Sequence, residues 1–486
     1  MRKCLLFNPP SALHVYNESK VRVAIPKLAN LSLAMIAGSL IEEGFDVKVI
    51  DLMLIDIRKA NDAANEEIIR FKPDIIGVTA TTPLFYEAAQ ISNIAKSISP
   101  DILTVLGGPH ASSLPFDSLK ESSFDCVVVG EGEMAIKEIV KSNSLEGIRG
   151  VYCRKNIDGD ISSEEAQKTL DVPIEDLPFP ALNLFEAKNY ICPKVIARNN
   201  PVGPIEMSRG CIFNCSFCNK KVFGRKFRIK TPKRVIEELL VLKKIGYREF
   251  HVLDDQFTTE IDKAKEICEE IIMAGIHMSW NLRTGIRVDK IDKEFLELAR
   301  RAGCYQVGIG FESGNQMCLD KIGKDIKIEQ GIKASELIRK AGIESVGFFM
   351  LGFLSETEET MNDTIRFAIK LNPDYAKATI LVPFPGTNIY NEFKNKGFIK
   401  TYDWSKYNFH NVYEIYQHPT LSWDVLNYYY DLFYRRFYFR PSYLVKRCWK
   451  SIMHGTLLND LFSGYEAFLK KNRKEKGNVN TYQRAN

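Results

Sequence analysis

The sequence has no long apolar run and no dense set of paired cysteines, and these two absences exclude several classes of protein. No stretch of 18 or more apolar residues occurs, so we expect nothing to span a membrane. The basic start MRKCLLFNPP has only a short apolar run, which is typical of a first strand rather than a secretion signal. Eleven cysteines scattered over 486 residues are typical of reduced thiols and predict a cytoplasmic protein.

The chain also lacks a strong charge of either sign. A net charge of +5 over 486 residues is too small to indicate a nucleic-acid partner. There is no internal repeat and no low-complexity tract. Hydrophobic residues make up 45% and charged residues 26%, which is ordinary for a globular protein of two or three domains.

Short apolar runs alternate with helical segments through the first 135 residues. The runs begin near residues 4, 47, 75, 102 and 126. This alternation predicts a parallel sheet covered on both faces, that is, a doubly wound, flavodoxin- or Rossmann-like α/β domain over residues 1–140. Its ligand should lie over the carboxyl ends of the strands, at the point where the strand order reverses. Several of these ends carry glycines, which let a large ligand approach the backbone.

Three further regions follow. Residues 141–200 are predicted to be a linker, with a hairpin turning at Asp158-Gly159 and a proline-rich stretch that acts as a spacer. Residues 201–400 contain about six longer β/α units and predict a partial (β/α)6 barrel with its site at the carboxyl ends of its strands. Residues 401–486 are predicted to form a helical C-terminal cap.

The segment RGCIFNCSFCNK holds Cys211, Cys215 and Cys218 in a C-x3-C-x2-C spacing. A structural zinc site usually needs four protein ligands, and no nearby C-x2-C or H-x3-H completes one. Three thiolates can instead bind three irons of a cubane cluster and leave the fourth iron open, as in catalytic metal sites. Zinc or purely structural cysteines remain the alternative.

This loop, with Phe217 before its last cysteine, resembles the radical S-adenosylmethionine (SAM) superfamily. The resemblance implies a [4Fe–4S] cluster on the three cysteines, with SAM chelating the open iron and being cleaved reductively to methionine and a 5′-deoxyadenosyl radical. The segments GFESGN, MLGFLSET and PFPGT resemble barrel motifs of the same superfamily. A helix cap or a tight turn is the alternative at each position. The SAM contacts that the resemblance implies are Asp254, Asp255, Arg287, Glu312 and Ser313.

The segments GGPHAS and VVGEGE, taken with the barrel, resemble the cobalamin-binding domain of B12-dependent radical SAM enzymes. The likeness covers roughly residues 1–400. Many cobalamin proteins supply a lower axial histidine from a D-x-H-x-x-G motif, which this sequence lacks, so His110 is not assigned as a cobalt ligand. A histidine bonded to the loop backbone is its alternative role. The cobalamin contacts that the resemblance implies are Asn8, Thr79, Gly107, Gly108, His110, Gly130 and Glu131.

The resemblance implies C-methylation of an unactivated carbon in a small-molecule or lipid-like substrate, with a methyl group from methylcobalamin and electrons from a partner such as flavodoxin or ferredoxin. The first alternative is radical cyclisation or oxidation without methyl transfer, as in the anaerobic magnesium-protoporphyrin cyclase. Methylthiolation is less favoured, because only Cys4 and Cys126 lie within residues 1–135 and provide no second cluster. The non-enzyme alternative is a corrinoid or iron–sulfur carrier.

Residues 428–450 combine many aromatics with six Lys/Arg and one acidic residue. A helical cap that packs its aromatics on the barrel is the first interpretation. The second is a helix that makes peripheral contact with a membrane surface. The third is a cap over a lipid or tetrapyrrole substrate.

Overall fold

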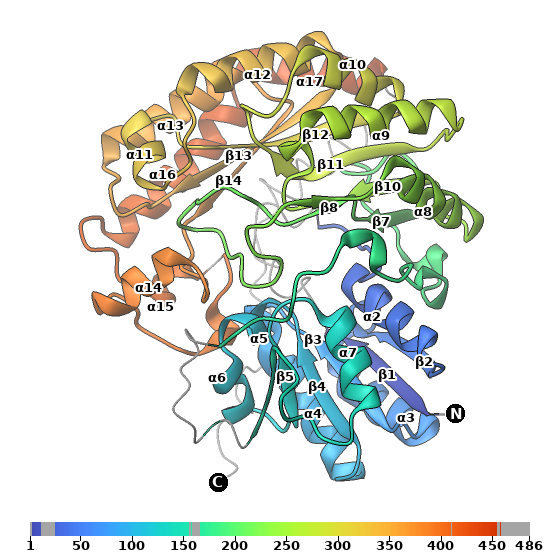
Figure 1. The fold of residues 1–486 in the computed structure, drawn as a ribbon. Coiled ribbons are helices and arrows are strands. Elements are labelled where there is room, and N and C mark those ends of the chain that lie inside the picture. Colours follow the sequence, from blue (N-terminus) through green and yellow to red (C-terminus); the bar gives the residue numbers. More distant parts are fainter. Residues whose placement is uncertain are drawn as a thin grey trace.

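The computed structural model describes residues 2–10, 25–154, 157, 166–409, 411–453 and 457. These residues form two α/β domains that pack against each other. Figure 1 shows an N-terminal domain below and a barrel-like domain above it. The doubly wound domain, the partial barrel and the helical C-terminal segment predicted from the sequence are all confirmed. Among the described residues, no helix is long and apolar enough to cross a membrane.

The N-terminal sheet has the order β2-β1-β3-β4-β5-β6, with β1 to β5 parallel. The order reverses between β1 and β3, which is where a doubly wound sheet opens a ligand crevice. Helices α2 and α7 pack together, as do α3 and α4. The elements are β1 (Lys3–Asn8), α2 (Leu31–Glu42), β2 (Asp46–Asp51), α3 (Ile57–Phe71), β3 (Ile75–Thr79), α4 (Phe85–Ile98), β4 (Leu103–Gly107), α5 (Pro109–Ser113), α6 (Pro115–Lys120), β5 (Cys126–Val128), α7 (Gly132–Lys141) and β6 (Val151–Cys153).

The sixth strand was not expected in this sheet. The segment predicted to start a separate hairpin instead adds β6 antiparallel to β5, with Val128 opposite Val151. An apolar strand placed there covers a sheet edge that would otherwise be open. The predicted turn at Asp158-Gly159 lies outside the described residues.

The second sheet has the order β14-β13-β12-β11-β10-β7, and every neighbouring pair is parallel. Since β7 and β14 do not pair, the barrel is open. A short antiparallel ribbon, β8 with β9, flanks the cysteine loop. The elements are β7 (Val202–Ile205), β8 (Ser208–Arg209), β9 (Arg228–Ile229), α8 (Pro232–Lys244), β10 (Glu249–Val252), α9 (Ile261–Met273), β11 (Ser279–Ile286), α10 (Lys293–Arg301), β12 (Cys304–Glu312), α11 (Gln316–Lys321), α12 (Ile328–Lys340), β13 (Glu344–Leu351), α13 (Glu358–Leu371) and β14 (Tyr375–Ile380).

The C-terminal segment comprises α14 (Asn388–Asn395), α15 (Val412–Ile415), α16 (Trp423–Tyr438) and α17 (Pro441–Met453). Helix α16 lies along the open edge of β14. The Tyr434 hydroxyl donates to the Ala378 carbonyl oxygen (2.9 Å), and the Tyr438 hydroxyl donates to that of Ala376 (2.8 Å). Each hydroxyl also accepts a hydrogen bond from the backbone N–H of the same strand residue. Helix α16 therefore satisfies the backbone hydrogen-bonding groups of this edge strand, as a further strand would.

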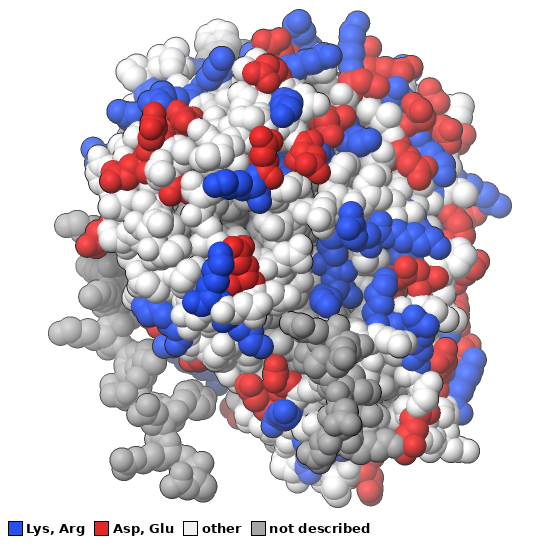
Figure 2. All heavy atoms as spheres, turned by 60° about the vertical axis from the view of Figure 1, so that its left-hand side comes forward, with Lys and Arg blue, Asp and Glu red and all other residues white. Residues whose placement is uncertain are grey.

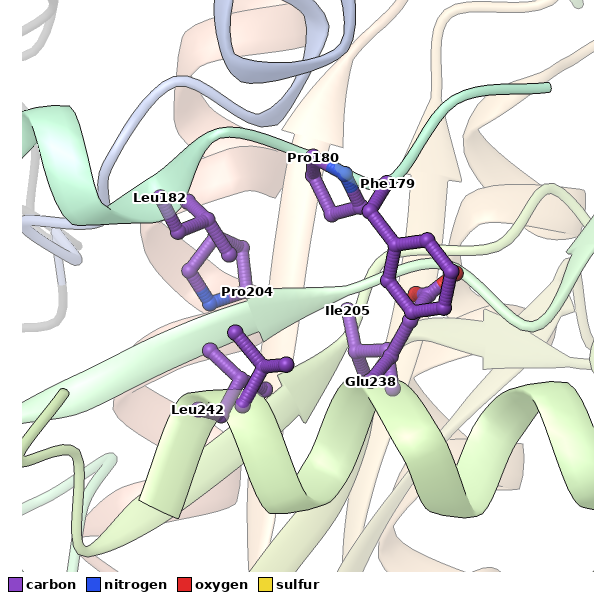
Figure 3. Close-up of a pocket in the computed structure, with 8 residues that line it drawn as sticks. Phe179, Pro180, Leu182, Pro204, Ile205, Glu238 and Leu242 are labelled. Carbon is purple, nitrogen blue, oxygen red and sulfur yellow. The ribbon is translucent and has the colours of Figure 1, made fainter. Parts of the chain in front are cut away.

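The proline-rich linker is packed against both domains rather than acting as a mere spacer. The Tyr190 hydroxyl donates to Asp51 of the N-terminal domain (2.9 Å), and Arg234 of α8 donates to the Pro178 carbonyl oxygen (3.0 Å). Where the linker crosses β7 and α8 it leaves an apolar pocket, shown in Figure 3, lined by Phe179, Pro180, Leu182, Pro204, Ile205, Glu238, Val241 and Leu242. The Glu238 carboxylate is paired with Lys230 at 2.8 Å, so this pocket is a packing gap without available polar groups.

A buried ion-pair cluster joins the two domains. Arg209 donates to Glu131 (2.8 Å) and to Glu133 (2.5 Å) across the interface, and Arg228 donates to the same Glu131. Arg209 also pairs with Glu206 at 2.6 Å. The Arg209 and Glu131 side chains are only 3% and 4% exposed, so each charge depends on its partners for solvation.

We expect Glu131→Ala to destabilise the protein by about 3–5 kcal/mol, because it leaves two guanidinium groups buried with fewer counter-charges. Glu42→Ala is the matched control, since Glu42 is 52% exposed and pairs with Lys137 on the surface. That substitution should change stability by no more than about 1 kcal/mol. Urea unfolding measures both, and equal small effects would contradict the role given to the cluster.

Candidate cofactor site

The cysteine loop begins directly after β8, at the mouth of the barrel. Gly210 opens it with a φ of +81°, and a Cβ there would lie 2.2 Å from the Lys226 carbonyl oxygen, so only glycine fits. The loop is fixed internally by the Cys218 amide, which donates to the Cys215 carbonyl oxygen (3.2 Å). It is fixed to the barrel by the Ser216 amide, which donates to Ile322 (2.9 Å).

The three thiols suit a cluster rather than a single ion. All eleven cysteines are free, and Cys211, Cys215 and Cys218 are partly or fully exposed. In the described part of the chain, no group of three or more His, Cys, Asp or Glu side chains is arranged to hold one metal ion. A cubane does not require that arrangement, because each thiolate binds a different iron. We therefore propose that these three cysteines hold a [4Fe–4S] cluster, which supplies one-electron chemistry at the barrel mouth.

A buried cation that the sequence analysis missed lies beside this loop. Lys324 donates to Glu312 at 2.7 Å, and both side chains are nearly inaccessible. Burial alone would lower the pKa of Lys324, but Glu312 and Cys215 raise it, so the ammonium stays charged next to the loop. Lys324 lies far from the cysteines in sequence and forms part of no recognisable motif. Glu312 itself has a φ of +62°, an uncommon conformation that turns its side chain toward this lysine.

All five predicted SAM contacts have protein partners: Glu312 pairs with Lys324, Asp255 accepts from the Gly210 amide, and the other three are bonded to the barrel itself. Asp254 is 2% exposed and accepts from the Met207 amide (2.8 Å) and the Ser208 hydroxyl (2.6 Å). Burial raises the pKa of Asp254 to about 8. The Ser313 hydroxyl lies 3.2 Å from that of Thr364.

Arg287 holds two loops together. Its guanidinium donates to the Lys324 carbonyl oxygen (2.6 Å) and lies 3.7 Å from the centre of the Phe213 ring in the cysteine loop. We propose that Arg287, Asp254 and Ser313 position the site. Asp255 and Glu312 then remain as direct SAM contacts. Asp255 is exposed and accepts from the Gly210 amide at 3.2 Å.

The predicted cobalamin residues lie along one edge of the N-terminal sheet. Asn8, Thr79 and Gly107 end β1, β3 and β4. The Asn8 side chain is fixed between Asp51 (2.7 Å) and Asn30 (3.0 Å), so its orientation is set before any ligand arrives.

Gly130 and Glu131, two further residues predicted to contact cobalamin, are held by contacts of their own. Gly130 follows β5 with a φ of +99°, and its amide donates to the Ser112 hydroxyl (3.1 Å). The Glu131 side chain points away into the interdomain cluster, so only its backbone remains for a cofactor.

The His110 side chain is fully buried, and among the described residues its ring makes no hydrogen bond to the loop backbone, which its alternative role requires. Its ring stacks on Phe85 with centroids 4.3 Å apart and meets the edge of Trp404 at 5.5 Å. Burial lowers its pKa to about 3, so it is neutral. Its Nδ1 lies 3.3 Å from the Thr82 hydroxyl, while Nε2 has no partner among the described residues.

The two predicted sites meet through one asparagine of the cysteine loop. The Asn219 amide donates to the Ser113 hydroxyl of α5 (2.7 Å) and to the Pro385 carbonyl oxygen (2.9 Å) in the PFPGT turn. A Cβ on the next residue of that turn, Gly386, would lie 2.5 Å from the Ser113 hydroxyl. The cysteine loop, the carboxyl edge of the N-terminal sheet and the last barrel turn are therefore in direct contact, as Figure 1 shows for α5 below the barrel.

Gly107 and Gly108 provide a matched test of this edge. A Cβ on Gly107 meets no atom within 4 Å, whereas on Gly108, at φ +95°, it would lie 2.6 Å from the Thr79 hydroxyl. We expect Gly108→Ala to cost about 1–3 kcal/mol of stability. Gly107→Ala should leave stability unchanged but reduce retention of hydroxocobalamin, because its methyl group occupies the cofactor's approach. Chemical unfolding and corrinoid absorbance after gel filtration measure the two effects. Full corrinoid retention by Gly107→Ala would contradict contact at this edge.

Comparisons with known proteins agree with the two-domain description. The model of the Radical SAM superfamily matches residues 205–368, and that of the B12 binding domain matches residues 21–140. The uncharacterized methyltransferase PH0819 of Pyrococcus horikoshii is 33% identical, over 95% of this chain and 97% of its own length. The anaerobic magnesium-protoporphyrin IX monomethyl ester cyclase of Rubrivivax gelatinosus is 35% identical, over 78% of this chain and 68% of its own.

Among solved structures, the radical SAM methyltransferase TsrM of Kitasatospora setae, with cobalamin and a [4Fe–4S] cluster bound, has the same fold. The TM-score is 0.64 at 21% identity, covering 81% of this chain and 78% of that one. The fold, both family matches and the full-length relative lead to one assignment. The chain belongs to the radical SAM enzymes with a B12-binding domain, whose cofactors are a [4Fe–4S] cluster, SAM and cobalamin.

Proposed function

We propose that the enzyme transfers a methyl group to an unactivated carbon of a small-molecule or lipid-like substrate. One observation carries the proposal: the Asn219 contact with Ser113 and Pro385 brings the cysteine loop and the predicted cobalamin edge into direct contact. The likeness to a methyltransferase over nearly its whole length supports the same reaction. When bound, the cofactors would supply hydrogen abstraction on the barrel side of the domain interface and a methyl group on the side of the N-terminal sheet.

The protein's own residues position these groups and control charge. Asp255 accepts from the Gly210 amide at the start of the cysteine loop, and Arg287 lies on the Phe213 ring within it, so both hold the loop in place. Lys324 places a positive charge beside Cys215, which favours thiolate ligands and an anionic cluster. On the other side, Gly107 leaves open space for a flat ligand. A flavodoxin or ferredoxin is the electron donor that we propose, in a cytoplasm whose reducing conditions suit eleven free cysteines.

Radical cyclisation or oxidation without methyl transfer is the second candidate. It is favoured by the 35% identity to the magnesium-protoporphyrin ester cyclase of Rubrivivax gelatinosus. Both reactions begin with SAM cleavage, so the site geometry alone does not separate them.

The test is anaerobic turnover by the full chain with dithionite, hydroxocobalamin and SAM labelled in its methyl group. Methyl transfer predicts both 5′-deoxyadenosine and S-adenosylhomocysteine, with the label passing to the corrinoid. Deoxyadenosine alone, with bound but unlabelled corrinoid, would favour the second candidate. If neither nucleoside product formed, the enzymatic assignment would be overturned, and a carrier role would remain.

Cys218 and Cys448 form a matched pair, because both are exposed and only Cys218 lies in the loop. We expect Cys218→Ala to lose the broad iron–sulfur absorbance and to reduce SAM cleavage to background, since one iron loses its thiolate. Cys448→Ala should retain both properties. Iron content and deoxyadenosine formation are the measurements, and full iron with normal cleavage in Cys218→Ala would contradict the cluster assignment.

A further inference from the structure

Helix α17 presents a continuous apolar stripe to solvent. Its members recur at helical spacing, and each is at least 47% exposed: Leu444, Val445, Trp449, Ile452 and Met453. Val445 is 72% and Trp449 is 67% exposed. No charged side chain lies within the stripe. Figure 2 shows one face of the molecule, on which acidic and basic side chains are scattered among wide uncharged areas.

The opposite face of α17 is firmly attached to the barrel, so the direction of the stripe is fixed. Tyr443 is 5% exposed, and its hydroxyl donates to the Asp374 carbonyl oxygen at 2.9 Å. Lys446 and Lys450 both pair with the Asp374 carboxylate, at 3.3 Å and 2.5 Å. These contacts use the polar residues of the helix on its inner side and leave the apolar ones outside.

The surroundings of the stripe are positively charged. Residues 435–453 contain six Lys/Arg and no acidic residue. Asp374 neutralises at most one of the two lysines that it binds. Arg435 and Arg436, on the last turn of α16, are exposed to solvent. An apolar stripe with an interfacial tryptophan and neighbouring cations is the pattern of helices that lie in the surface of an anionic bilayer.

We propose that α17 attaches the enzyme peripherally to anionic lipid bilayers, with its stripe inserted among the headgroups and the arginines of α16 against lipid phosphates. Asp374 directly precedes β14, so α17 lies at the amino ends of the barrel strands, whereas the cysteine loop lies at their carboxyl ends. Attachment through α17 therefore leaves the mouth of the barrel open. The proposal does not depend on which reaction the site performs.

The test is co-sedimentation of the full-length protein with sonicated vesicles of phosphatidylcholine alone or mixed equally with phosphatidylglycerol. We expect binding to the mixed vesicles that weakens with added salt. Val445→Glu/Trp449→Glu should lower the partition coefficient by about tenfold or more. Arg435→Gln/Arg436→Gln should lower it by about fivefold for each charge removed. Met273→Glu is the matched control, because Met273 is 70% exposed on α9 rather than on α17, and it should bind normally.

Circular dichroism and gel filtration of each variant separate loss of binding from loss of fold. The proposal would be overturned if the wild type sedimented equally with vesicles that contain phosphatidylglycerol and with vesicles that lack it. Equal binding by Met273→Glu and Val445→Glu/Trp449→Glu would overturn it as well. A third contradicting outcome is that the wild type binds neither kind of vesicle and forms a dimer that dissociates in Val445→Glu/Trp449→Glu. The stripe would then be an interface between two copies of the chain.

Discussion

The buried cluster of Arg209, Arg228, Glu131 and Glu133 is the constraint on which the rest of the molecule depends. It sets the angle at which the N-terminal sheet meets the barrel, because charges removed from water tolerate little change in the positions of their partners. Arg209 also directly precedes the loop glycine Gly210. The same side chain therefore orients the two domains and anchors the start of the cysteine loop.

From this anchor the site is assembled by parts of the chain that are distant in sequence. Arg287, directly after β11, holds the cysteine loop through the Phe213 ring, and the Ile322 carbonyl oxygen after α11 holds it through the Ser216 amide. Asn219 holds it against Ser113 of the other domain. These contacts are ordinary hydrogen bonds and ion pairs, and they leave the three thiols free of disulfides and the Gly107 edge without a close neighbour. Chemistry in such enzymes belongs to the cofactors, and the protein's contribution is this arrangement.

The sequence predicted the alternating strands and helices and the cysteine motif, because both are patterns among residues that are close together in the chain. Uninterrupted apolar runs located the parallel strands of both sheets, and the cysteine spacing located the loop within a few residues. Long-range pairings were not predictable, because nothing near Lys324 or Arg228 in sequence distinguishes them from surface charges. Arg287 was predicted as a SAM contact, and its guanidinium bonds to backbone carbonyl oxygens that only the folded chain brings to it. The hairpin segment became β6, since an apolar strand next to an open sheet edge pairs with it.

We expect the cluster and the cobalamin to lie close to each other across the interface between the two domains. The most direct measurement is pulsed electron paramagnetic resonance on the enzyme loaded with both cofactors, with the iron–sulfur cluster reduced and the corrinoid in its cobalt(II) state. A magnetic interaction between the two spins is expected in the wild type, and this interaction should weaken in Arg209→Gln, where the angle between the domains is no longer fixed. Two independent spectra from fully loaded wild-type protein would contradict it.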